Sequence, residues 1–183
     1  MCRSQSRGRA PAIAFACALA LLCGVSASRA AGHTHVHGVA RLDIAVEAAR
    51  LIVQMESPLD NLLGFERAPR TDAERRQADA LVAQLKTADA MFKIDPAAQC
   101  TLAHVELASA ALKLGSPDPS EDGHADIDAS FEFHCAEATK AAYIDVGLFE
   151  ASRMQQIEVQ VATPRGQFKR DLKRPAYRIL LTK

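Results

Sequence analysis

Apolar and polar residues alternate along two neighbouring segments in the first third of the chain, which is the pattern of strands that bury one face. In the segment 39–47 the apolar positions lie two residues apart, at Leu42, Ile44 and Val46. After a short break the same period continues through 51–55 and stops at Pro58. Two such segments with a short connection predict a β-hairpin. The apolar stretch 59–65 that follows is expected to form a short turn or helix.

The clearest alternation lies at 125–135. Its apolar face carries Ala125, Ile127, Ala129, Phe131, Phe133 and Cys135. A face with two phenylalanines is expected to lie in the core. Weaker patterns predict further strands at 101–112, 143–146, 157–162, 167–172 and 177–181, with a turn at Pro164-Arg165-Gly166 that makes 157–172 a hairpin.

One segment has helical rather than strand periodicity. Thr71 followed by Glu74 has the spacing of a capping box, and apolar residues then recur at Ala78, Leu81, Val82 and Leu85. This pattern predicts an amphipathic helix at about 72–87, and a second, short helix is expected near 148–154. The chain is therefore predicted to be α+β, with mostly antiparallel sheets, one main helix and short helices.

The first thirty residues have the features of an export signal. Arg3, Arg7 and Arg9 precede an uncharged stretch whose most apolar part, 13–25, is too short to span about 30 Å of hydrocarbon. Ser28-Arg29-Ala30 fits the small-x-small pattern of a cleavage site, and Val25-Ser26-Ala27 is a weaker match. An uncleaved membrane anchor is the alternative, which the short, alanine-rich stretch disfavours.

We therefore predict a cleaved signal peptide at 1–30 and a single domain at 31–183, with a flexible, histidine-containing start at 31–38. The whole chain has 22 basic and 22 acidic side chains, but residues 1–30 hold four arginines and no acid. The predicted domain is therefore weakly acidic, which argues against a nucleic-acid partner. We also expect no membrane attachment after cleavage.

The sequence carries no recognisable catalytic pattern. It has no Gly-x-Ser-x-Gly elbow, no Gly-rich phosphate loop and no His-Glu-x-x-His helix. We therefore expect that the protein is not an enzyme.

Two cysteines, Cys100 and Cys135, remain after the predicted cleavage. An exported chain with one pair of cysteines is expected to form a disulfide. A pair of metal-binding thiolates is the alternative, but neither cysteine belongs to a Cys-x-x-Cys motif.

Histidines are the main candidate metal ligands in this sequence. His33, His35 and His37 alternate with other residues, so an extended chain presents the three imidazoles on one side. Imidazole nitrogen binds Zn²⁺ and Cu²⁺, although the same segment is also compatible with a polar terminus that binds nothing specific. A second pair of candidate ligands is formed by His124 and Asp126, two residues apart at the end of the polar loop 115–124.

Other polar residues near this pair are expected to be surface residues. Asp128, Glu132 and His134 are interpreted as a solvated strand face, and His134 is too far along the strand to join Asp126. His104 is expected to be a structural or surface residue.

The predicted cleavage suggests a different metal site. A cut after Ala30 would create the start Ala31-Gly32-His33, whose amine, two backbone amides and imidazole form a square-planar set of four nitrogens. This geometry suits Cu²⁺ or Ni²⁺. A cut one residue away would destroy it.

The ordered set of motifs resembles the ZrgA-like family of periplasmic zinc-uptake proteins, long known only as a domain of unknown function. The matching pieces are the run His35 to Ala45, Glu56-Ser57-Pro58, Asn61-Leu62-Leu63-Gly64-Phe65-Glu66 with Ala68-Pro69, Cys100, His124 through Phe133 to Cys135, and Thr163-Pro164-Arg165-Gly166-Gln167. Members often carry a long His/Asp/Glu-rich loop before the strand that holds the second cysteine. Here that loop is 116–124 and contains only His124, which limits the expected capacity to one or two ions.

The resemblance implies a periplasmic protein of Gram-negative bacteria that binds zinc and assists a zinc ABC importer or its solute-binding protein. The expected ligands are His33, His35 and His37, with His124 and Asp126 as a second or completing set. Two alternatives stay open: Cu²⁺ or Ni²⁺ binding through the amino-terminal chelate, and an adaptor domain that docks a transporter component without metal.

Overall fold

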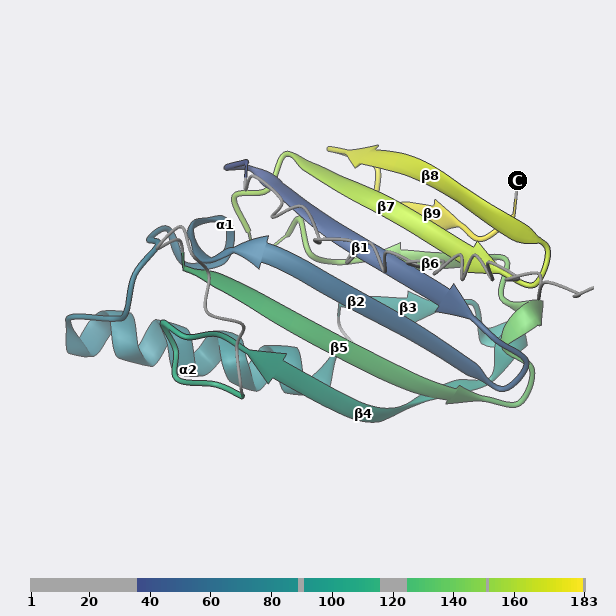
Figure 1. Ribbon diagram of the computed structural model, residues 1–183, viewed down its shortest axis with the longest axis horizontal. Coiled ribbons are helices and arrows are strands. Elements are labelled where there is room, and N and C mark those ends of the chain that lie inside the picture. The colour runs from purple at the N-terminus through teal and green to yellow at the C-terminus, as the bar shows by residue number, and fades with distance from the viewer. Residues whose placement is uncertain (1–35, 89–90, 116–124, 151, 183) are drawn as a thin grey trace, which may run out of the picture. The chain divides into compact units, whose positions relative to one another are not determined.

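The alternating segments pair into two sheets, shown in Figure 1. The computed structural model describes residues 36–88, 91–115, 125–150 and 152–182, all within the unit Thr34–Lys183. The larger sheet has the order β4-β5-β2-β1-β7-β8, and the smaller sheet has the order β3-β6-β9. The strands are β1 (Val39–Val46), β2 (Arg50–Pro58), β3 (Phe92–Ile94), β4 (Cys100–Ala108), β5 (Asp126–Cys135), β6 (Tyr143–Val146), β7 (Gln156–Thr163), β8 (Gly166–Lys173) and β9 (Arg178–Leu180).

Among the described residues, one helix is long and the others are short. They are α1 (Leu59–Leu63), α2 (Asp72–Thr87) and the 3₁₀ helices η1 (Pro96–Ala98) and η2 (Ala138–Lys140). The prediction of a main helix at 72–87 is confirmed, with Thr71 as its N-cap and the capping box to Glu74 in place. Within the described ranges, no helix has the length and apolar character that a membrane crossing requires.

Both predicted hairpins are confirmed. β1 pairs antiparallel with β2, and β7 pairs antiparallel with β8. The pairing of β1 with β7 is parallel, so the large sheet is mixed rather than purely antiparallel. The sequence did not predict this pair, nor the short strand β3.

The helix predicted near 148–154 is wrong. Residues 148–150 form a turn, and the described residues after it are not helical. The guanidinium of Arg174 accounts for the difference, because it donates hydrogen bonds to the carbonyls of Phe149, Ser152 and Met154. These carbonyls are therefore satisfied by a side chain from a distant segment, and a helix is not needed to satisfy them. The strand predicted at 101–112 is also too long, since the chain turns after Ala108 and Ser109 bridges back to Leu114.

The two faces of the large sheet differ as the alternation predicted. One face is buried and includes Leu42, Ile44, Leu51, Val53, Ile127, Phe131, Ile157 and Val159. Helix α2 adds Ala78, Leu81 and Leu85 to the same core, and the small sheet adds Phe92, whose ring centroid lies 5.0 Å from that of Phe131. The other face, called here the outer face, is polar and includes Arg41, Asp43, Gln54, Glu56, Asp128, Glu132 and Glu158.

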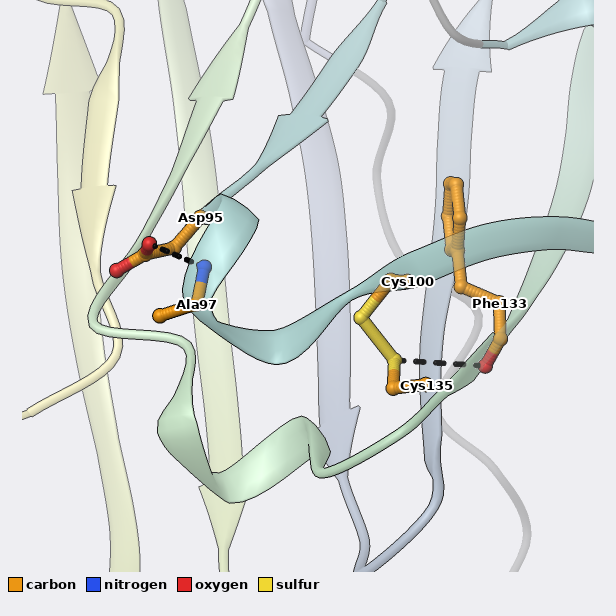
Figure 2. The surroundings of a disulfide bond; sticks show 5 residues. All are labelled: Asp95, Ala97, Cys100, Phe133 and Cys135. Carbon is orange, nitrogen blue, oxygen red and sulfur yellow. Dashed lines mark hydrogen bonds between the residues drawn. A yellow bond between two sulfur atoms is a disulfide. The ribbon is translucent and has the colours of Figure 1, made fainter.

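The predicted disulfide is confirmed and joins Cys100 to Cys135, which face each other in the ladder of β4 and β5. Figure 2 shows it at the start of β4, just after η1, where Asp95 Oδ1 accepts a hydrogen bond of 3.0 Å from the amide of Ala97. With both sulfurs in this bond, the alternative of a thiolate metal site is excluded.

Removing the disulfide should destabilise the fold strongly. The bond closes a loop with a sequence separation of 35, which corresponds to about 4 kcal/mol in the chain-entropy model. We expect the Cys100→Ser/Cys135→Ser variant to lose about this much unfolding free energy in urea titrations. Reduced wild-type protein is the control and should shift by a similar amount, whereas an unchanged midpoint in the variant would contradict the prediction.

The contacts of Glu74 at the N-terminus of α2 should make the folded state less stable as the pH falls into the acidic range. Glu74 accepts hydrogen bonds from the Arg67 guanidinium at 2.8 and 3.0 Å and from the amides of Arg70 and Thr71. The Arg67 hydrogen bonds, followed by the amide of Arg70, lower the pKa of Glu74 from 4.5 to about 2. A lowered pKa in the folded state adds stability that is present above the unfolded-state pKa and is lost as pH falls from about 4.5 to about 2.

We therefore expect the Tm of Glu74→Gln to fall less steeply than that of the wild type between pH 5 and pH 2 in thermal melts followed by circular dichroism. Glu137→Gln, which removes an exposed ion pair with Lys140, is the matched control and should keep the wild-type slope. Parallel curves for Glu74→Gln and the wild type would show that Glu74 does not carry this effect.

Candidate functional site

Among the predicted ligands, His37 lies beside two carboxylates. Its Nδ1 lies 3.3 Å from Asp60 Oδ2, and its Nε2 lies 3.3 Å from Glu66 Oε1. The imidazole is largely exposed (63%), whereas the side chains of Asp60 and Glu66 are mostly shielded (27% and 19%). Both nitrogens of the ring therefore face carboxylate oxygens.

The two carboxylates reach His37 because α1 is short and tightly closed. Asp60 lies on α1, which begins directly after β2 ends at Pro58. Gly64 ends the helix with φ +81° and donates its amide to Asp60 O at 2.9 Å. A Cβ at Gly64 would lie 2.7 Å from the mobile guanidinium end of Arg153, which can move aside, so it is the positive φ that favours glycine here. The turn carries Glu66 back toward His37.

A buried asparagine fixes this turn to the start of β1. Asn61 Oδ1 accepts a hydrogen bond of 2.7 Å from the amide of Gly38, and its Nδ2 donates to Val39 O at 2.8 Å and to Ser57 Oγ at 3.2 Å. Asn61 is 1% exposed, so these bonds replace water that cannot reach it. His37 precedes Gly38 and is thereby positioned beside α1.

Asp126, from the second predicted pair, lies at the same end of the sheet. It is paired across the ladder with Pro58, and the amide of Leu59 donates to Ala125 O at 2.9 Å. Figure 1 shows the start of β1, helix α1 and the start of β5 together at the left. Two segments that are far apart in the sequence thus meet around α1. His33, His35 and His124 lie outside the described residues.

The side chains at this end are not already arranged around a metal ion. Across the described ranges, no group of three or more His, Cys, Asp or Glu side chains is placed to hold one. For His37 the reason is geometric, because its two ring nitrogens point in different directions and its carboxylate partners therefore do not converge on one point. One nitrogen would have to release its carboxylate to bind a metal. The donor types themselves, imidazole nitrogen and carboxylate oxygen, are those that Zn²⁺ accepts.

Sequence reasoning did not identify Asp60, Asn61 and Glu66 as site residues. Asn61 and Glu66 stand in the motif that carries the family resemblance, but nothing in their spacing indicated that they meet His37. A carboxylate just after a strand end was the available signal, and such residues are common at helix starts.

The residues expected to lie on the surface do so. The side chains of His104 and His134 are 61% and 65% exposed. His134 lies eight residues beyond Asp126 on β5, which is about 26 Å at 3.3 Å per residue. It therefore belongs to the opposite end of the sheet, as the sequence indicated.

A cleft of about 650 Å³ opens on the outer face between these two ends. Its lining includes Arg41, whose guanidinium lies 3.4 Å from Glu56 and 3.8 Å from Glu158. His37 and Asp126 are not among its lining residues, so the cleft is separate from these two predicted ligands.

Comparison of the sequence with models of known protein families gives a match to one family. A family model described as "ZrgA family zinc uptake protein" matches residues 34–181, which include all the described strands. His35, His37, His124 and Asp126 fall within the match, and His33 lies just before it. No curated protein matches the chain.

Asn61 should be the residue whose loss most disturbs this end. In Asn61→Ala the partly buried amide of Gly38 and carbonyl of Val39 lose their side-chain partner, and we expect a loss of about 1–3 kcal/mol in unfolding free energy. Urea denaturation measures the loss, and faster hydrogen exchange at Gly38 should accompany it. Gln160→Ala, which removes an exposed hydrogen bond to Asp43, is the control and should change stability by less than about 0.5 kcal/mol. Equal stability of the two variants would contradict the role assigned to Asn61.

Proposed function

Because the chain belongs to the ZrgA family of zinc uptake proteins, we propose that it binds Zn²⁺ in the periplasm and passes the ion to a zinc ABC importer through that importer's solute-binding protein. Zinc is the cargo of this process. Membership of the family supports the role in zinc uptake. The residues around α1 are the candidate zinc-binding site.

The observation that carries the proposal is the meeting of His37 with Asp60 and Glu66 at the end of the sheet where β5 begins. Asp126 begins β5, where it is paired with Pro58 directly before α1, at the same end of the sheet as His37. We propose His33, His35 and His37 as the main donors, completed by His124 and Asp126.

Exposure of His37 suits a protein that transfers an ion. An exposed ligand is open to a partner's donors, so the ion can pass from one donor set to the other without unfolding of the carrier. Asp60 and Glu66 add negative charge next to the imidazole, which favours a divalent cation. Because the loop 116–124 contains a single histidine, we propose capture of one ion at this end rather than storage of many.

Zinc affinity of the processed, untagged protein tests the ligands. In competition titrations with a chromophoric chelator at pH 7, the triple variant His33→Ala/His35→Ala/His37→Ala should weaken the tightest zinc equivalent by more than about 100-fold. Partners of metal ligands alone are worth about 10- to 100-fold, and here the ligands themselves are removed. Asp126→Asn should weaken it less.

Thr101→Ala, an exposed change at the opposite end of the sheet, is the control and should leave this equivalent unchanged. Undiminished affinity in the triple variant would exclude the histidine triplet. A visible d–d band on addition of Cu²⁺, with weak zinc binding, would instead favour the amino-terminal chelate.

Transfer tests the role in uptake. Zinc-loaded protein mixed with the metal-free solute-binding protein of a zinc importer should deliver its ion faster than zinc dissociates into a chelator. Delivery no faster than that dissociation would contradict the proposed transfer. Zinc-independent capture of the solute-binding protein, without transfer, would indicate an adaptor.

A further inference from the structure

A second group of imidazoles and carboxylates lies on the outer face of β4 and β5, at the end that carries the disulfide. We propose that His104, Glu132 and His134 form a second binding site for a divalent transition-metal ion, Zn²⁺ or Cu²⁺, with Glu106 as an additional carboxylate ligand. The inference does not depend on the site proposed around His37.

The register of the two strands brings these residues together. His104 is paired with Glu132 across the ladder, and His134 follows two residues after Glu132 on the same face. Glu132 is thus the central residue, flanked by one imidazole across the ladder and one along its own strand. It is also the least exposed of the group, at 29%, against 61% for His104 and 65% for His134.

In this structure each histidine of the group contacts a glutamate of its own strand rather than one of the neighbouring strand. His134 Nε2 lies 3.2 Å from Glu132 Oε1, and His104 Nε2 lies 3.2 Å from Glu106 Oε1. The side chains therefore do not yet converge, in line with the finding that no group among the described residues is already placed around a metal. Exposed pairs of this kind contribute little to stability, so turning the His104 ring toward Glu132 costs little.

The spacing allows convergence. Directly opposed residues have Cβ atoms about 4.5–5.5 Å apart, and diagonal neighbours about 7–8 Å apart, within reach of long side chains. Imidazole and glutamate can span these gaps and meet at the metal–ligand distances of about 2.0–2.2 Å that Zn²⁺ requires. The ladder shifts its register between Leu102 and His104, and such a bulge changes the direction in which a side chain points.

The disulfide next to this group holds the two strands in register. Cys135 follows His134 directly, and Cys100 lies opposite Cys135. Donors on a fixed backbone lose less freedom when they bind an ion. The bond therefore holds the backbone of both ligand-bearing strands in place where the ligands are.

One positive group competes for the central carboxylate. Arg50 is paired with His134 across the ladder to β2, and its guanidinium lies 3.6 Å from Glu132 Oε1. Its shorter hydrogen bonds, of 2.8 and 3.0 Å, go to Glu47 Oε2. The closer contacts of Arg50 are thus with Glu47, and a metal ion at Glu132 would have to displace only the longer contact with Arg50.

The test counts metal equivalents in the processed, full-length protein. Titration with Zn²⁺ should give two equivalents in the wild type and one in His104→Gln/His134→Gln, with the tighter equivalent unchanged. The triple variant of His33, His35 and His37 should show the opposite pattern and lose the tighter one. Thr101→Ala, on the same outer face without a metal-binding side chain, should keep both. Failure of the proposed function and failure of this site are therefore separate results.

Nuclear magnetic resonance of the imidazole rings identifies the residues. The ring signals of His104 and His134 should broaden together at substoichiometric Cu²⁺ and shift together with Zn²⁺, and Glu132→Gln should weaken both responses at least 10-fold. An unchanged urea midpoint would show that the variants remain folded. The proposal is overturned if the double variant binds as many equivalents as the wild type, or if the two rings respond at different metal concentrations.

Discussion

A single buried side-chain amide determines how one end of this molecule is built. Asn61 cannot reach water, so its oxygen and nitrogen must find partners, and they find the amide of Gly38 and the carbonyl of Val39. Its own carbonyl accepts the amide of Arg153, in the segment that enters β7. The start of β1, helix α1 and the approach to β7 are joined through one residue. The position of His37 follows from this arrangement.

The two ends of the large sheet offer different surroundings for metal chemistry. At the α1 end, His37 lies between shielded carboxylates that are fixed by a short helix and a glycine turn. At the disulfide end, His104 and His134 stand on open strands whose register is held by a covalent bond. The first depends on tertiary packing and the second on the ladder of two neighbouring strands. The family role in zinc uptake is compatible with both.

Local patterns predicted the elements that depend on nearby residues. The helix Asp72–Thr87 forms where Thr71 and Glu74 make a capping box, and the hairpins form where short turns join alternating segments. The prediction failed near 148–154, where Arg174 binds three carbonyls from a distant segment. It also missed the parallel pairing of β1 with β7.

The sequence by itself determined which residues face the core, where the main helix begins, which cysteines pair and which histidines are candidates for metal binding. These follow from period, capping and composition, which act over a few residues or over the whole chain. Only the tertiary structure decided that Asp60 and Glu66 meet His37 and that Asp126 lies at the same end. Such meetings depend on strand order and on buried hydrogen bonds between residues far apart in the chain, and no local pattern records them.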